Sequence, residues 1–268
     1  MRRKTTLLFL AVFFSVVLSG FASASTYYVY TQGDGTWHDA NKTWTGDSNL
    51  CWAAAASNIL DWAGWGTATY TTETSIFQYY KDHWTNDGSL PEHGWHWWVD
   101  GTLPPQEPGW SQVSQSGGNF WPGVNFGSAY HEAWGGPWGA NNNLLAAVDS
   151  YFDTGYGVTL AIYKPKIGGG YYGHALTIWG YDYSIGARGI QYNGVWVTDS
   201  DDGYLGLKYY AVSWDRGTGE WDLQGGYDGW FIGGVEALGQ NHVPLPPTLL
   251  LFGSGLLGLV CWRRYRKE

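Results

Sequence analysis

Cysteine, methionine and charged side chains are all scarce in this chain. Its 268 residues include two Cys and one Met, and only 14% of them are charged. Cys261 lies in an apolar stretch near the C-terminus, so it is not expected to pair with Cys51 in a folded domain. We therefore expect no internal disulfide, which leaves Cys51 as a lone thiol that needs an explanation.

Basic residues are scarcer still in the body of the protein. The full chain has 14 basic and 23 acidic residues and a formal net charge of -9. Without the terminal segments 1–24 and 243–268, seven basic and 22 acidic residues remain, which gives a net charge of -15. A body this acidic argues against nucleic acid or anionic lipid as a partner and favours neutral or basic targets.

The N-terminal segment has the pattern of a secretory signal peptide. Basic residues at Arg2, Arg3 and Lys4 precede an apolar run from Leu7 to Leu18, and Ala22-Ser23-Ala24 fits a cleavage site. We therefore expect residues 1–24 to be removed and the mature chain to begin at Ser25.

The C-terminal segment, residues 243–268, predicts sorting or anchoring at a membrane. Prolines at 244, 246 and 247 lead into an uncharged stretch from Thr248 to Trp262, and a basic cluster closes the chain. About 15 helical residues span about 22 Å, slightly less than a bilayer core. The layout resembles the PEP-CTERM sorting tail, with Pro-Leu-Pro-Pro in place of Pro-Glu-Pro. The resemblance implies an exosortase-type partner. An ordinary single-span anchor would also place the body at or beyond the cell surface.

Residues 25–242 form the predicted folded domain, and the whole chain is rich in Trp (19), Tyr (20) and Gly (40). Apolar periodicity predicts helices at 51–62, 72–84 and 143–152, and loops with short elements over 85–140. Strands are expected at 157–163, 175–181, 194–198, 208–214 and 230–235. Helices followed by antiparallel strands predict an α+β fold with two lobes.

Cys51 lies where the first predicted helix begins. The cap-type residues Asp47, Ser48 and Asn49 precede it, and an alanine-rich run follows. The positive end of a helix favours the thiolate, which is the nucleophilic form. The alternative is that Cys51 is a small buried apolar residue.

His174 and Asp199 are the partners that the sequence offers to Cys51. His174 stands at the start of one predicted strand and Asp199 at the end of the next. Their midpoint falls in the predicted turn at 184–189, so a hairpin around that turn would bring the two side chains together. An Asp beside a His fixes its tautomer and stabilises the imidazolium. The alternative is a structural His near a capping Asp.

Three segments of the chain resemble the immunoglobulin-degrading cysteine endopeptidases of the IdeS/Mac type. They arrive in the order found in that family and comprise residues 37–54, 173–182 and 197–210. The resemblance implies a papain-like fold, in which a helical N-terminal lobe carries the nucleophile and an antiparallel β C-terminal lobe carries the His and Asp.

The resemblance also implies a role for each site residue. It makes Cys51 the nucleophile and His174 the general base and later the acid; Asp199 orients the imidazole and Asp201 supports it. Lys42 would complete an oxyanion hole with the backbone N–H of Cys51, although its spacing to Cys51 is one residue shorter than in the family. The family has Gly after the nucleophile, and Trp52 in that position would crowd the cleft.

The sequence therefore predicts an exported cysteine endopeptidase that acts on a protein or peptide. We expect no cofactor or metal, because neither the His93–His96 pair nor the loop 199–203 fits a known ligand spacing. One alternative is a non-catalytic binding protein of the cell surface or biofilm matrix, suggested by the Trp-rich residues 94–140. Another is the same site used for amidase or acyl-transfer chemistry.

Overall fold

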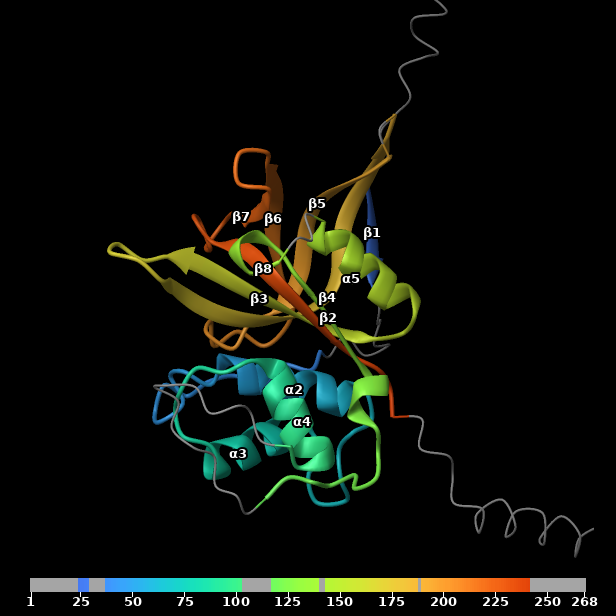
Figure 1. Ribbon diagram of the computed structural model, residues 1–268, viewed down its shortest axis with the longest axis vertical. Helices are drawn as coiled ribbons and strands as arrows, with labels where there is room; N and C mark the ends of the chain where they lie inside the picture. The colour runs from blue at the N-terminus through green and yellow to red at the C-terminus, as the bar shows by residue number, and fades with distance from the viewer. Residues whose placement is uncertain (1–23, 29–36, 103–116, 140–142, 188, 242–268) are drawn as a thin grey trace, which may run out of the picture.

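Figure 1 shows a layer of short helices packed beneath a curved antiparallel sheet. The computed structural model describes residues 24–28, 37–102, 117–139, 143–187 and 189–241. The predicted signal peptide up to residue 23 and the whole predicted sorting tail lie outside these residues.

The helices and strands follow one another along the chain. The α-helices are α2 (Cys51–Trp62), α3 (Glu73–His83), α4 (Pro91–Asp100) and α5 (Leu144–Asp153), and two 3₁₀ turns are η1 (Phe126–Ser128) and η2 (Gly136–Trp138). The strands are β1 (Ala24–Tyr28), β2 (Tyr130–Trp134), β3 (Gly157–Pro165), β4 (Tyr171–Gly186), β5 (Gly189–Thr198), β6 (Lys208–Asp215), β7 (Glu220–Leu223) and β8 (Phe231–Leu238).

Six of the strands close into an antiparallel barrel. The order β4-β3-β8-β7-β6-β5 returns to β4, because β4 also pairs with β5. The long strand β4 makes this closure: its first half pairs with β3, and its second half pairs with both β1 and β5. The remaining strand, β2, pairs with β8.

The papain-like fold expected from the sequence is wrong. In the described residues, eight strands form one sheet around a closed barrel, and the four α-helices have only 10 to 12 residues each. Strand β1 precedes all the helices and still joins the sheet, so the chain does not divide into a helical first lobe and a β second lobe. The pairing of strand edges depends on residues far apart in the sequence, so local sequence patterns do not predict it.

The local predictions held better than the architecture. The three predicted helices correspond to α2, α3 and α5, and the five predicted strands correspond to β3, β4, β5, β6 and β8. The helix α4 was missed, as were β1, β2 and β7. A glycine in the middle of α4 hides it from sequence patterns, but Gly94 is needed there: an added Cβ would lie 2.8 Å from Trp52 and 3.0 Å from Tyr80.

Two hydrophobic cores hold the layers together. One fills the barrel, and the other lies between the barrel wall and the helices α2, α3 and α4. The second core contains the fully buried rings of Trp95, Trp97 and Trp98. Trp95 and Trp98 donate their indole N–H groups to backbone carbonyls at 3.1 and 2.8 Å. The tryptophan content therefore serves largely to pack this helical layer.

Removing buried volume from the barrel should destabilise the protein. Ile178 on β4 is completely buried in the barrel core. Ile178→Ala should lower the free energy of unfolding by about 2–5 kcal/mol, because it leaves a cavity in a closed structure. Urea unfolding followed by tryptophan fluorescence measures the change.

Ile185 on the same strand is the matched control. It is 63% exposed, so Ile185→Ala should change the free energy of unfolding by less than about 0.5 kcal/mol. Equal effects of the two substitutions would contradict the barrel core described here.

Candidate active site

Cys51 is the first residue of α2, as the sequence predicted. The expected side-chain cap is absent, because the N-cap position is occupied by Leu50, which makes no side-chain capping bond. No capping side chain therefore accepts the first N–H groups of α2, which lie beside the thiol. Their partial positive charge favours an anion at this end of the helix.

The cap-type residues before Cys51 hold the preceding loop instead. The Asp47 carboxylate accepts the Thr43 N–H at 2.8 Å and lies 3.0 Å from the Lys81 ammonium. The Ser48 carbonyl accepts a hydrogen bond from Lys42 Nζ at 2.8 Å. These bonds fix the loop that delivers Lys42 to the start of α2.

His174 connects the thiol to the carboxylate of Asp199. It lies on β4, is 7% exposed, and its side chain hydrogen-bonds with that of Cys51. Its Nε2 lies 2.9 Å from Asp199 Oδ1, which leaves Nδ1 as the ring nitrogen for the sulfur. The structure thus brings together the Cys, His and Asp that the sequence predicted.

Lys42 and Asp201 complete the predicted set. Lys42 Nζ lies 2.5 Å from Asp201 Oδ1, and Asp201 Oδ2 lies 3.8 Å from His174 Nδ1. The Lys42 ammonium is also close enough to the thiol to lower the pKa of Cys51 by Coulombic attraction. The positive charge of Lys42 is therefore held in this site by the Asp201 carboxylate, which also faces the His174 imidazole.

The surroundings favour a thiolate paired with an imidazolium. Burial raises the pKa of Cys51, but the hydrogen bond with His174, the positive charges of His174 and Lys42 and a bond with the Ala175 backbone together lower it. Burial lowers the pKa of His174, but contacts with Asp199 and Cys51 outweigh this and raise it. Such a pair favours the thiolate, which is the nucleophilic form of the sulfur.

Two tyrosines that the sequence analysis missed also bind Asp199. Tyr210 Oη donates to Asp199 Oδ2 at 3.1 Å, and Tyr227 Oη donates to the same oxygen at 2.8 Å. Burial raises the pKa of Asp199, but its bonds with His174, Asp201 and Tyr227 lower it to about 2. The chain has 20 tyrosines, and nothing in the sequence distinguishes Tyr210 and Tyr227 from the others.

The expected crowding of the cleft by Trp52 is wrong. Its side chain is 1% exposed, and its ring packs against Tyr80 and Trp84 in the helical core. Its indole N–H donates to the Asp87 carbonyl at 3.0 Å. Since α2 turns by about 100° per residue, Trp52 points into the core while Cys51 points toward the barrel.

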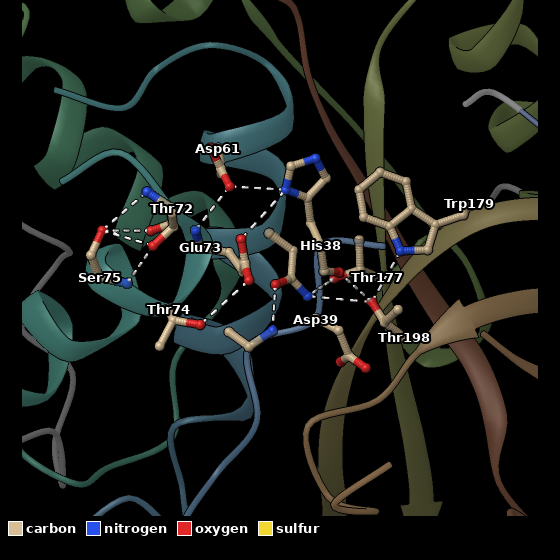
Figure 2. Close-up of polar contacts among 12 residues, drawn as sticks. His38, Asp39, Asp61, Thr72, Glu73, Thr74, Ser75, Thr177, Trp179 and Thr198 are labelled. Carbon is tan, nitrogen blue, oxygen red and sulfur yellow. Dashed lines mark hydrogen bonds and ion pairs between the residues drawn. The ribbon is translucent and has the colours of Figure 1, made fainter. Parts of the chain in front are cut away.

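The segment that carries Lys42 is joined to the loop that carries Asp199. The Thr198 hydroxyl donates to the His38 carbonyl at 3.1 Å (Figure 2), and the Lys42 N–H donates to the Ser200 carbonyl at 3.0 Å. Between them, Asp39 accepts the Gly206 N–H at 2.8 Å. The position of Lys42 is therefore fixed by the loop that follows β5 as well as by the loop that leads into α2.

His38 forms a second polar cluster, between the end of α2 and the start of α3. Its Nδ1 lies 2.9 Å from Asp61 Oδ2 and 3.6 Å from Glu73 Oε2 (Figure 2). Burial opposes a charge on His38, but the bonds with Asp61 and Glu73 outweigh it and raise its pKa to about 9. The bond with His38 lowers the pKa of Glu73 to about 2.

Two sets of side chains in the described part of the chain have ligand-type atoms within 4.8 Å of one another, namely His38 with Asp61 and Glu73, and His174 with Asp199 and Asp201. In the first, the protonated imidazole already lies between the two carboxylates, where a cation would bind. The second belongs to the arrangement around Cys51. Hydrogen bonds and ion pairs thus account for both clusters.

Comparison with known proteins identifies the end of the chain. Residues 242–267 match the model of the PEP-CTERM protein-sorting motif, which confirms the expected tail. No curated protein matches the chain. No finding supports the resemblance to the IdeS/Mac family, and the sorting-motif model matches only residues 242–267.

The sorting motif places the protein among exported proteins that are sorted at the cell envelope. It also implies recognition by exosortase-type machinery. Within the residues that the structure describes, no helix has both the length and the apolar character needed to cross a membrane.

The His38 cluster should make stability depend on pH. His38 titrates near 9 in the folded protein and near 6.5 when unfolded, so its contribution is complete below pH 6.5 and is lost as the pH rises through 9. His38→Gln should lower the free energy of unfolding by about 1–2 kcal/mol at pH 6, and the deficit should shrink toward pH 9. Urea unfolding at several pH values measures it.

His131→Gln is the control for this prediction. His131 lies exposed on β2 and stacks against Tyr151 and Tyr156. Its substitution should change the free energy of unfolding by less than about 0.5 kcal/mol, because the side chain is exposed. A deficit for His38→Gln that stayed constant from pH 6 to 9 would contradict the ion-pair assignment.

Proposed function

We propose that this chain is an exported cysteine peptidase with Cys51 as its nucleophile. One observation carries the proposal: Cys51, His174 and Asp199 form a continuous hydrogen-bonded chain at the start of a helix, and the positive charge of Lys42 lowers the pKa of the thiol. A thiolate needs a base and the base needs an orienting group, and these three side chains supply all three parts.

The first step is attack of the Cys51 thiolate on the carbonyl carbon of the substrate. A C–S bond forms and the carbonyl π electrons move to oxygen, giving a tetrahedral oxyanion. The N–H of Cys51 at the start of α2 and the Lys42 ammonium are the donors available to this charge.

Collapse of the oxyanion breaks the C–N bond and leaves a thioester. The His174 imidazolium gives its proton to the departing amine as this bond breaks. Water then attacks the thioester, and the neutral His174 accepts its proton. Breaking the C–S bond releases the carboxylic acid and restores the thiolate, while Asp199 keeps the ring in one orientation throughout.

Amidase and acyl-transfer activities would use the same thioester. They differ from peptide hydrolysis only in the leaving amine or in the group that accepts the acyl chain. The resemblance of three segments to IdeS/Mac-type enzymes supports cysteine peptidase chemistry at the matched site residues, and it carries no immunoglobulin specificity over. The acidic body favours neutral or basic substrates.

A non-catalytic binding protein is the weaker proposal. It was suggested by the Trp-rich residues 94–140, but Trp95, Trp97 and Trp98 are buried and fill the helical core, where they cannot stack on a sugar. Trp138 of the same segment is 42% exposed, and a single exposed ring is weaker support than the arrangement around Cys51.

Cys51 should be alkylated rapidly at acidic pH. The His174 imidazolium and Lys42 favour its thiolate, so iodoacetamide should modify Cys51 at pH 5 at least about 100 times faster than an ordinary thiol of pKa near 8.5. Mass spectrometry of the digested protein measures the rate. Cys261 in the sorting tail serves as the ordinary thiol within the same chain.

Cys51→Ser should abolish cleavage of a peptide library, and His131→Gln should leave cleavage unchanged. Alkylation of Cys51 as slow as that of Cys261, or cleavage that survives in Cys51→Ser, would overturn the proposed function.

Lys42 should act mainly in the transition state. Lys42→Met removes a cation from the oxyanion and should lower kcat by about 10²–10³, with KM changed by less than about threefold. Lys164→Met is the control, since Lys164 lies on β3 and bonds the Asp228 carbonyl at 3.2 Å. A kcat within fivefold of the native value would remove Lys42 from the proposed oxyanion hole.

A further inference from the structure

The carboxylate of Asp199 is fully occupied by hydrogen-bond donors. Oδ1 lies 2.9 Å from His174 Nε2 and accepts the Asp201 N–H at 3.0 Å. Oδ2 accepts the hydroxyls of Tyr210 at 3.1 Å and Tyr227 at 2.8 Å. A carboxylate offers about four acceptor sites, so each has a donor and the group has no freedom to rotate without breaking several bonds.

The two tyrosines come from separate parts of the barrel. Tyr210 lies on β6 opposite Val195 of β5, and Tyr227 lies in the loop between β7 and β8. Gly226 has φ of +133°, and a Cβ there would approach the Tyr210 ring to 3.3 Å. Glycine therefore lets this loop run close over Tyr210 and set both hydroxyls on one oxygen.

Tyr227 contacts the base as well as the carboxylate. Its ring stacks on the His174 imidazole with centroids 5.6 Å apart and planes at 27°, and it meets the Tyr210 ring edge-on at 5.1 Å. One side chain thus limits rotation of the imidazole and of its partner carboxylate together. Asp199 itself is 2% exposed, so water does not substitute readily for either phenol.

Both phenols remain donors over the working pH range. Burial and the neighbouring Asp199 charge raise the pKa of Tyr210 and of Tyr227 above the ordinary value for tyrosine. A phenol that keeps its proton stabilises the ionised carboxylate and disfavours its protonated form.

We propose that Tyr227 and Tyr210 are positioning residues, which keep Asp199 ionised and rigid and thereby hold His174 against Cys51. This inference rests on the proposed peptidase function, and it adds two residues that act through Asp199 without touching the substrate. Without them, Asp199 would have only two donors, both on one oxygen, and could swing away from the imidazole.

The pH profile of Cys51 alkylation by iodoacetamide tests this inference. In Tyr227→Phe the ring stays and one donor is lost, so the pKa of Asp199 should rise. The acid limb of the profile should then move upward by about 1 pH unit, and further in the Tyr210→Phe/Tyr227→Phe double variant. The other charged or titratable groups around Asp199 and its partners are unchanged in every variant, so they do not cause a difference between the profiles. These groups are His174, Cys51, Lys42, Asp39, Asp201 and Asp202.

Tyr192→Phe is the matched control. Tyr192 lies in the barrel core and its hydroxyl is bonded to another carboxylate, that of Asp149. Its loss should change thermal stability without moving the acid limb. In an Asp199→Asn background, Tyr227→Phe should change the alkylation rate at pH 5 by less than about threefold, because its charged acceptor is gone.

The outcomes separate this inference from the proposed function. If Cys51 of the native protein reacts as an ordinary thiol, the peptidase proposal fails. If the native protein shows the acid-range thiolate but both tyrosine variants keep its profile and lose only stability, the positioning role is overturned. Should Tyr227→Phe fail to fold, Tyr210→Phe removes the other donor and decides the question alone.

Discussion

Pairing of β4 with β5 is the contact on which both the barrel and the candidate site depend. The pairing runs from Thr177 opposite Thr198 to Gly186 opposite Gly189, and it turns a curved sheet into a closed barrel. The same pairing brings His174, just before this stretch of β4, within 2.9 Å of Asp199, just after β5 ends. Closure fixes both strands at two edges, so the base and its carboxylate are held rigidly.

One buried amide side chain joins the helical layer, which carries Cys51, to the barrel. Asn58, two turns along α2 from Cys51, donates to Thr177 and Thr198 at 3.0 and 3.3 Å, and its oxygen accepts the Ala40 N–H at 2.8 Å. It therefore ties α2 to both strands of the hairpin and to the segment that leads to Lys42. Because a helix is stiff, fixing Asn58 also fixes where Cys51 meets the barrel.

Much of the site could be predicted because its signals are local. A cysteine before an alanine-rich run, and a His and an Asp at the open ends of a hairpin, need only short-range patterns. The side-chain cap and the direction of Trp52 were wrong for one reason. The side chains of Asp47, Ser48 and Trp52 contact residues distant in sequence, namely Lys81, Asn86 and Tyr80. Tyr210 and Tyr227 were missed because only folding brings them to Asp199.

The sequence by itself determined the main helices and strands, the grouping of Cys51, His174 and Asp199 as candidate residues, and the sorting motif at the C-terminus, which a family match confirms. The tertiary structure alone decided that the strands close into a barrel and that β1 joins it from the other end of the chain. Residue periodicity records which face of an element is buried. It does not record which unpaired strand edges will meet, because that depends on hydrogen bonds between segments more than a hundred residues apart.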